Sequence, residues 1–429
     1  TRGGPGPAPG AARPPPPPGG GGARGGGGGG GGRPPRGGGG GGGAAPSHAP
    51  HWHAASPSPL PSPQRGEGVT AKGQAMLRLE PRPAPSRAWT WASPLLALAI
   101  TVVIGVALFS AMGKDPVRGL QVFFWEPIKS AYALGELGVK ATPLLLIALG
   151  LAVCFRSNVW NIGAEGQFVI GAIAAGGVAL LAGKETGRWI VLAVLLAGVL
   201  GGMLWAGITA LLRDKFNAGE ILVSLMLVYV AIQVLGYLVY GPWKDPAGYN
   251  FPQTRTFDAV TRIPRLMQGS RVNIGALIAL AGAALLWVYL FRTRSGFAQQ
   301  VGGLAPAAAR YAGFSSRRAL WTALLISGGT AGLAGALEVA GPLRQLTPHV
   351  PAGYGFAAII VAFVGRLHPF GMVLAAILMS MFYIGGELAQ SRLGLPKSLT
   401  GVFQGLLLFT LLACDVLVNY RLRRTGGSR

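Results

Sequence analysis

Charged side chains are scarce in this sequence of 429 residues: Asp, Glu, Lys and Arg together make up 12% of it, against 50% hydrophobic residues. Soluble globular domains carry about 25% charged residues. They need these residues to cover the surface that faces water, and this chain has too few to do so. The composition therefore excludes an ordinary soluble protein and predicts an integral membrane protein.

Acidic residues are scarcer still, with 14 Asp and Glu against 37 Lys and Arg, which gives a net charge of +23. A nucleic-acid-binding protein would gather its basic residues on one face, with aromatic residues among them. After the first 75 residues, the basic residues here stand singly between long apolar runs, as they do beside membrane spans. We therefore expect membrane lipid as a partner, and no nucleic acid.

Residues that carry out chemistry are also missing. The two cysteines, Cys154 and Cys414, stand in apolar runs without the spacing of a metal site. The nearest approach to a phosphate-binding loop, Gly177–Glu185, has one residue too many between its glycines and Glu185 where Ser or Thr would hold magnesium. The sequence predicts no catalytic residue, no metal site and no cofactor in this chain. Any ATP and Mg²⁺ that drive it would be bound by a separate chain.

The first 75 residues are dominated by Gly and Pro, as in the run Gly37–Gly43. Such a composition cannot bury a core, so we expect this segment to be disordered. It has no apolar stretch typical of a secretory signal. We expect residues 1–75 to be a mis-assigned start read from GC-rich DNA, with a transmembrane domain over residues 76–429. The alternative is a genuine disordered cytoplasmic tail.

Long apolar runs follow one another from Trp91 onward. A helix needs about 20 residues to cross the hydrocarbon core of a membrane. The pattern predicts an all-α bundle of about ten transmembrane helices, some short or broken. The expected spans are 92–112, 141–155, 165–182, 189–212, 218–240, 272–291, 319–341, 355–365, 369–385 and 398–418. The short spans 141–155 and 355–365 suggest half-helices, which are tolerated inside a bundle or beside a water-filled path.

Basic residues in the loops favour a cytoplasmic N-terminus. The densest case is the loop 292–318, which holds five Arg and no Asp or Glu, and cytoplasmic loops carry such an excess. Within the spans, Gly198 and Gly202 are four residues apart, as are Gly328 and Gly332. Small residues at this spacing let helix backbones approach closely, so we expect a tightly packed bundle.

Ionisable residues inside membrane spans are costly and tend to face the bundle interior or a water path. Glu165 stands in a polar, Gly-punctuated stretch, Asn158–Gln167, between two apolar runs. This stretch suits part of a solute path. It equally suits a helix start, in which Asn161 caps the next helix and Glu165 favours its first turn through the helix dipole. Both readings can hold together.

Three further acidic residues occur in or beside the spans. Glu220 begins a span and could also act as a partner of the helix dipole. Glu338 lies near the end of its span, where it could line a solute path or reach outward to the membrane surface. Asp415 lies near the end of the last span, close to Arg421, and we expect an interfacial charge there.

The loop 292–318 contains a predicted short, Ala-rich helix. Proline is tolerated in the first turn of a helix, so Pro306 marks its start. Gly313 stands just past its end, where glycine commonly terminates a helix. A short basic helix held between two spans could transmit force from a soluble partner. The alternative is a helix that lies on the membrane surface.

Several stretches together resemble the permeases of the branched-chain amino acid, ribose and nucleoside group of ABC importers. Over about residues 115–418 the matching segments stand in the family's order. They are FRSNVWNIGAEGQ (155–167), NAGEILVSLML (217–227), GPWKDP (241–246) with Phe251 and Pro252, AARYAG (308–313), GYGFAAI (353–359) and GRLHP (365–369). The segment 241–246 is similar to the external loop of the nucleoside type.

The resemblance implies a permease that moves nucleosides or related simple sugars by alternating access, in a bacterial inner membrane. It implies an ABC ATPase subunit, a second permease subunit in a heterodimer, and a periplasmic or lipid-anchored solute-binding protein as partners. By analogy Asn161, Glu165, Gln167 and Glu220 would lie near the solute path, with Glu338 as a further candidate. The loop that meets the ATPase would include Pro306, Ala308, Arg310, Tyr311 and Gly313.

Two other functions stay open at this point. An ion-coupled secondary transporter of a small polar solute would carry its coupling site on broken helices at the midplane, here at Glu165 or Glu338. A membrane scaffold that transports nothing would not need the polar stretch 158–167.

Overall fold

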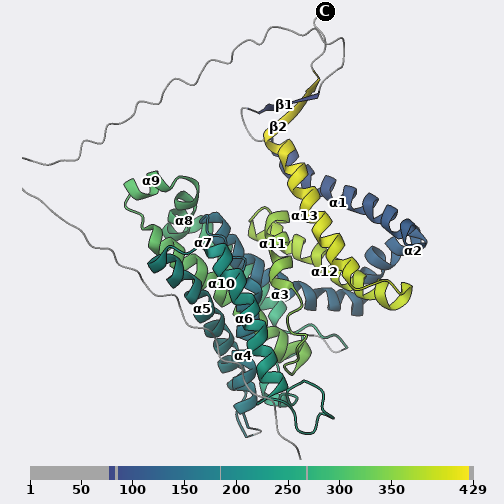
Figure 1. Ribbon diagram of the computed structural model, residues 1–429, viewed down its shortest axis with the longest axis vertical. Coiled ribbons are helices and arrows are strands. Elements are labelled where there is room, and N and C mark those ends of the chain that lie inside the picture. Colours follow the sequence, from purple (N-terminus) through teal and green to yellow (C-terminus); the bar gives the residue numbers. More distant parts are fainter. Residues whose placement is uncertain (1–76, 83–85, 184, 267–268, 425–429) are drawn as a thin grey trace, which may run out of the picture. The chain divides into compact units, whose positions relative to one another are not determined.

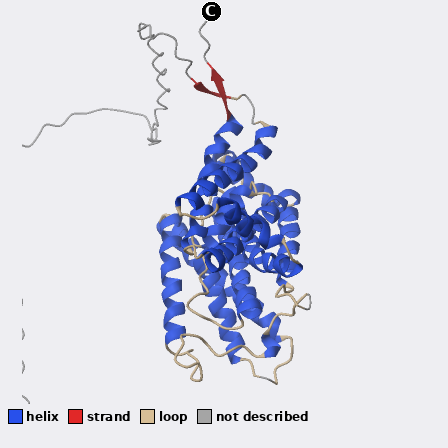
Figure 2. Ribbon diagram, turned by 90° about the vertical axis from the view of Figure 1, so that its right-hand side faces the viewer, coloured by secondary structure: helices blue, strands red, loops and turns tan. Residues whose placement is uncertain are grey.

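The computed structural model describes residues 77–82, 86–183, 185–266 and 269–424, so the predicted leader, residues 1–75, lies outside the described residues. Helices make up most of the described chain (Figures 1 and 2). The longer helices are α1 (Arg87–Ala111), α3 (Ala131–Arg156), α4 (Ala164–Leu181), α5 (Ile190–Phe216), α6 (Glu220–Tyr240), α7 (Gly275–Arg292), α10 (Ser316–Glu338), α12 (Pro369–Leu393) and α13 (Ser398–Asn419). The shorter ones are α2 (Pro116–Leu120), α8 (Arg294–Leu304), α9 (Pro306–Tyr311) and α11 (Tyr354–Val364).

Within the described ranges, nine helices are long and apolar enough to cross a membrane, and α11 is a shorter apolar helix. The prediction of about ten apolar helical segments is therefore confirmed, and so is the short segment at 355–365. One pair of strands was not predicted: β1 (Leu77–Pro81) runs antiparallel to β2 (Tyr420–Arg424). Its partners come from opposite ends of the described chain, so no local pattern could reveal the pairing.

The prediction of a half-helix at 141–155 is wrong. Helix α3 runs unbroken for 26 residues, and its first turns contain Glu136 and Lys140, which lie outside the predicted span. Both charges are paired: Lys140 lies 3.1 Å from Glu387 of α12, and Glu136 accepts two hydrogen bonds from Arg271. Because these partners offset the cost of charge, the helix can continue past residues that a hydropathy pattern treats as a boundary.

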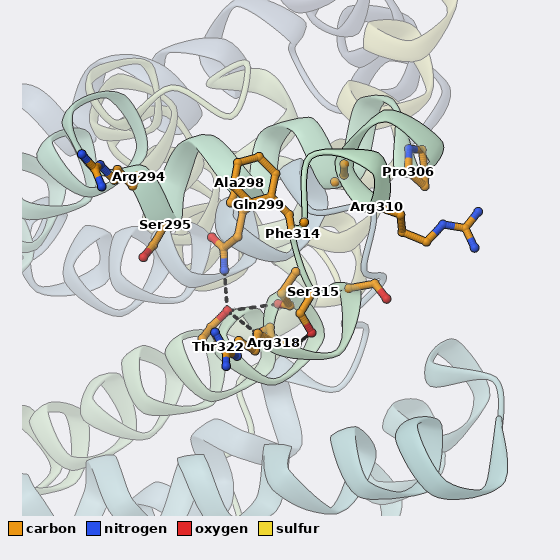
Figure 3. Close-up of a pocket in the computed structure, with 15 residues that line it drawn as sticks. Arg294, Ser295, Ala298, Gln299, Pro306, Arg310, Phe314, Ser315, Arg318 and Thr322 are labelled. Atoms are coloured by element: carbon orange, nitrogen blue, oxygen red, sulfur yellow. Dashed lines mark hydrogen bonds between the residues drawn. The ribbon is translucent and has the colours of Figure 1, made fainter.

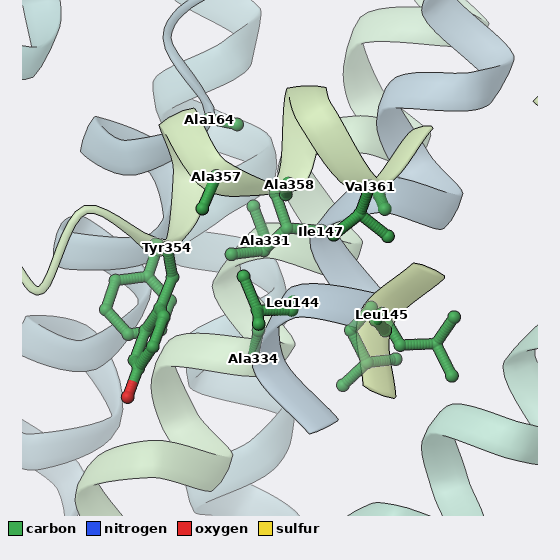
Figure 4. Packing of buried hydrophobic residues seen from close by; sticks show 14 of the residues in the cluster. Leu144, Leu145, Ile147, Ala164, Ala331, Ala334, Tyr354, Ala357, Ala358 and Val361 are labelled. Atoms are coloured by element: carbon green, nitrogen blue, oxygen red, sulfur yellow. The ribbon is translucent and has the colours of Figure 1, made fainter. Parts of the chain in front are cut away.

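Helices α3 and α10 form the centre of the bundle. In their most apolar stretches 83% of the α3 residues and 78% of the α10 residues are buried, compared with 22% in α6. Figure 4 shows Leu144 of α3 and Ala334 of α10 beside the ring of Tyr354 from α11. The outer helices leave many large apolar side chains exposed, as is expected where lipid replaces water.

The glycine pairs that the sequence singled out meet each other. A Cβ added to Gly202 of α5 would lie 2.1 Å from the carbonyl oxygen of Gly328 in α10, and one added to Gly332 would lie 2.1 Å from that of Gly198. The backbones of α5 and α10 are therefore in direct contact at two places about one helical turn apart. Gly171 of α4 joins the same seam, with Gly332 as its nearest neighbour. The prediction of close helix packing is confirmed.

Candidate functional site

The stretch 157–163 folds back into the bundle after α3 ends. Asn161 is fully buried, and its side-chain nitrogen donates to the hydroxyl of Ser327, halfway along α10, at 2.9 Å. The same amide exchanges two hydrogen bonds with the side chain of Gln167, at 3.0 and 3.2 Å. Each amide thus satisfies the other where water is absent. These contacts tie the start of α4 to α10.

Asn161 does not cap α4 in the expected way. The residue before α4 is Gly163, which contributes no side chain, and Asn161 instead accepts a hydrogen bond from the backbone N–H of Gly163 at 3.1 Å. Glu165 does lie in the first turn of α4, as predicted. Its carboxylate, however, points to a different helix.

Glu165 caps the start of α11. Its side chain is 1% exposed, and its two oxygens accept hydrogen bonds from the backbone N–H groups of Gly353, at 2.8 Å, and Gly355. The first N–H groups of a helix have no partner within the helix, and a carboxylate there also favours the helix dipole. Gly353 has φ +78°, a backbone conformation that glycine adopts without strain. A single acidic residue therefore fixes where the short helix begins.

A polar tract continues from this cap through the bundle. Tyr354 and Glu338 are both buried, and the ammonium of Lys140 lies 5.8 Å from the centre of the Tyr354 ring. Lys140 pairs in turn with Glu387. The tract links α3, α4, α10, α11 and α12 through groups that would be costly if they faced lipid.

The tract opens into a cavity of about 520 Å³ between α11, α12 and α13. Gly353 stands at one side of this cavity, and the hydroxyl of Tyr383 donates to the carbonyl of Ala352 at 3.3 Å. The polar side chains around it are Tyr383, Glu387, Lys397, Thr400 and Gln404, among mostly apolar neighbours. Glu387, the acidic residue of this lining, is already paired with Lys140, so hydroxyl and amide groups supply most of the polar contacts that the cavity offers.

Two predicted path residues, Glu220 and Glu338, are not at the start of α4 with the others. Glu220 occupies the first turn of α6, as predicted, where its carboxylate lies 3.2 Å from the guanidinium of Arg213. Glu338 is 8% exposed at the end of α10, so the alternative that it reaches outward to the surface is wrong. The structure brings Asn161, Glu165 and Gln167 together at the start of α4.

The sequence analysis did not identify Lys140, Tyr354, Tyr383 and Glu387 as candidate site residues. Lys140 and Glu387 lie outside the predicted spans 141–155 and 369–385, whereas α3 and α12 continue through them. A charge next to an apolar run in each of two spans was the available signal. Nothing in the sequence indicates that these two charges meet.

Arg366 holds together the end of the bundle from which α8 and α9 project. Its guanidinium donates to both carboxylate oxygens of Asp415, at 3.1 and 2.7 Å, and to the hydroxyl of Ser93. This cluster joins α1, α13 and the turn between α11 and α12. The expectation that Asp415 would be an interfacial charge beside Arg421 misses its partner, because Arg421 pairs with Glu80 at 2.8 Å.

The predicted short helix between two spans is present as α9. It begins at Pro306, and Gly313 follows its end with φ +78°. Tyr311 is 97% exposed, and Arg310 is also exposed, while Ala309 is buried. Helix α8 is anchored to the bundle because Gln300 accepts a hydrogen bond from Arg156 of α3 at 2.9 Å. The loop is therefore a firmly attached structure that presents Arg310 and Tyr311 outward.

Comparisons with known proteins agree with this arrangement. Residues 134–412 match the family described as branched-chain amino acid transport system / permease component. The glucose ABC transporter permease protein TsgB13 of Haloferax volcanii is 32% identical over 76% of this chain and 88% of its own length. The guanosine ABC transporter permease protein NupP of Bacillus subtilis is 30% identical, over 72% of this chain and 89% of its own. The nucleoside ABC transporter permease protein NupB of Lactococcus lactis is 26% identical, over 74% and 89%.

Proposed function

Because this chain belongs to the branched-chain amino acid transport system / permease component family, we propose that it imports nucleosides or related simple sugars by alternating access. It is a multi-pass membrane subunit of an ABC transporter and not an enzyme. The observation that carries the proposal is the short helix α11, whose start is fixed by Glu165 and faces a cavity between α12 and α13. Short half-helices of this kind line solute sites in secondary transporters, and we propose the same use of α11 here.

The chemistry of the cavity supports an uncharged solute with several hydroxyl groups. Tyr383, Thr400 and Gln404 offer hydrogen-bond donors and acceptors to the hydroxyl groups of such a solute. Relatives named for guanosine, nucleosides and glucose support the same class. Asn161, Gln167 and Glu165 would act by holding α4 and α11 in position beside the path. We propose that Glu338, buried at the end of α10, and Glu220, in the first turn of α6, also lie near the solute path.

We propose that ATP and Mg²⁺ are bound by a separate ATPase subunit, which meets the loop around Pro306, Ala308, Arg310, Tyr311 and Gly313. The exposure of Tyr311 and the attachment of α8 to α3 support this role. A loop that transmits force must be accessible to the ATPase subunit and rigidly attached to the bundle. A second, different permease subunit and a periplasmic or lipid-anchored solute-binding protein would complete the transporter. We propose that the chain lies in a bacterial inner membrane. In this membrane α8 and α9 would face the cytoplasm, where the ATPase subunit is.

An ion-coupled secondary transporter is the less favoured alternative, since relatives such as TsgB13, NupP and NupB are named as ABC transporter permeases. The solute is best identified by competition. Cells that carry this chain with its neighbouring genes would take up labelled guanosine while excess unlabelled uridine, glucose or leucine is added. Inhibition by uridine alone would identify nucleosides, whereas inhibition by glucose would identify simple sugars. Inhibition by leucine alone would contradict the proposed solute class.

A further inference from the structure

A second cavity, of about 450 Å³, lies between α8, α9 and the first turns of α10 (Figure 3). Apolar groups line part of it, among them Ala298, Ala309, Phe314 and Ala319. Three arginines, Arg294, Arg310 and Arg318, are also among its lining residues, and Figure 3 shows the guanidinium of Arg310 pointing outward; no Asp or Glu is among its described lining residues. The cavity, which we call the α8–α10 socket, is thus apolar inside and positively charged at its edge.

One polar atom in the socket has no partner. Gln299 is 3% exposed, and its side-chain nitrogen donates to the hydroxyl of Thr322 at 2.7 Å. That hydroxyl donates in turn to the carbonyl of Arg318 at 2.7 Å, which fixes the orientation of the amide. The Oε1 atom of Gln299 is left without a hydrogen bond among the described residues. A buried acceptor without a donor is costly, and it indicates that a donor from outside binds here.

The surroundings restrict what that donor can be. A carboxylate would suit the arginines but, when ionised, has no proton to give to Oε1. A Lys or Arg side chain has the proton, but three guanidinium groups at the edge would repel it. A neutral donor at the tip of an apolar body satisfies both conditions. Among side chains, the phenol of Tyr and the indole of Trp have this form.

We propose that the α8–α10 socket receives one Tyr or Trp side chain from a soluble partner, with acidic residues beside it that match the arginines. The proposal rests on the proposed function, in which this partner is the ATPase subunit. The O–H or N–H group would donate to Oε1 of Gln299, and the ring would pack against Ala298, Ala309 and Phe314. The acidic neighbours would pair with Arg294, Arg310 and Arg318 at the rim.

Photo-crosslinking in the assembled transporter tests which residue enters the socket. A benzophenone amino acid replaces Ser295, which is exposed at the edge of the socket, and the crosslinked peptide is identified by mass spectrometry. The matched control carries it at Ser110, which is exposed near the end of α1. We expect a crosslink from position 295 alone, to a segment of the ATPase subunit with a Tyr or Trp between acidic residues. A crosslink to a basic segment, to lipid, or to no protein would overturn the proposal.

Two substitutions test the hydrogen bond. Gln299→Leu removes the acceptor at similar size, and Gln299→Glu keeps an acceptor oxygen. With the full chain in lipid nanodiscs, we expect the Kd for the ATPase subunit to rise about fivefold in Q299L and less than twofold in Q299E. If wild type and Q299L bound the ATPase subunit with equal affinity and unfolded at the same temperature, the proposed role of the socket would be wrong. ATP-dependent uptake by the wild type would show that the proposed function still holds. Loss of ATP dependence in the wild type would instead refute the proposed function.

Discussion

Gly202 of α5 and Gly328 of α10 touch through their backbones: a Cβ on Gly202 would lie 2.1 Å from the carbonyl oxygen of Gly328. Neither glycine can gain a methyl group unless the two helices move apart, because the obstacle is backbone and not a flexible side chain. Since lipid offers no hydrophobic drive for helix association, this contact has to come from close fit. The α5–α10 seam thus anchors the centre of the bundle.

Gly202→Ala is expected to destabilise the bundle. Forced overpacking of this kind costs about 1–3 kcal/mol. Gly207→Ala on the same helix is the matched control, because nothing lies within 4 Å of its added Cβ, and it should be neutral or slightly stabilising. Thermal unfolding in detergent would compare the two variants. Equal unfolding temperatures would show that α5 and α10 are not in backbone contact.

Glu165→Ala should loosen the start of α11. It leaves the half-buried N–H of Gly353 and the buried N–H of Gly355 without acceptors, at a cost of about 1–3 kcal/mol for the buried group and less for the other. Glu165→Gln keeps one acceptor oxygen and should lose less stability. We expect solute uptake in the order wild type, E165Q, E165A, at equal amounts of protein in the membrane. Uptake by E165A equal to wild type would contradict the role of this cap.

The cluster of Arg366 with Asp415 should contribute more than an exposed ion pair does. The guanidinium contacts both oxygens of the carboxylate, and such bidentate bonds are among the stronger charged hydrogen bonds. A double-mutant cycle with Arg366→Ala and Asp415→Ala should give a coupling energy of about 1–2 kcal/mol. The same cycle on Arg421 and Glu80, a more exposed pair, should give about 0.2–1 kcal/mol. A coupling energy for Arg366 and Asp415 no larger than that for Arg421 and Glu80 would show that the Arg366 cluster contributes no more than an exposed ion pair.

Arg310→Ala and Tyr311→Ala should separate uptake from ATP hydrolysis. Both side chains are exposed on α9, so their removal should leave the fold and the amount of protein in the membrane unchanged. We expect uptake to fall at least about tenfold, the effect of losing roughly 1.4 kcal/mol of subunit contact. Arg118→Ala, at an exposed arginine on α2, is the control and should transport normally. Normal uptake in both α9 variants would refute the docking role of this loop.

The helices and the α9 loop could be predicted because their signals are local. Apolar runs marked most spans, Pro306 and Gly313 marked the ends of a short helix, and paired glycines marked close packing. Glu165 was identified as a functional candidate, but its actual contact with the start of α11 joins residues 188 positions apart. No periodicity contains that information.

The errors also have physical causes. The predicted span 141–155 begins ten residues after α3 does, and the ion pair that lets α3 contain Lys140 involves Glu387 on another helix. The strand pair β1–β2 joins segments from opposite ends of the described chain. In each case a distant partner decides the local structure.

The most direct test of the proposed function is to measure whether ATP or an ion gradient drives uptake. Cells with this chain and its neighbouring genes would be given labelled guanosine, and ATP depletion and a protonophore would be applied separately. Uptake that stops on ATP depletion, survives the protonophore and requires the ATPase gene is the predicted result. Uptake that the protonophore alone abolishes would contradict it and identify an ion-coupled transporter.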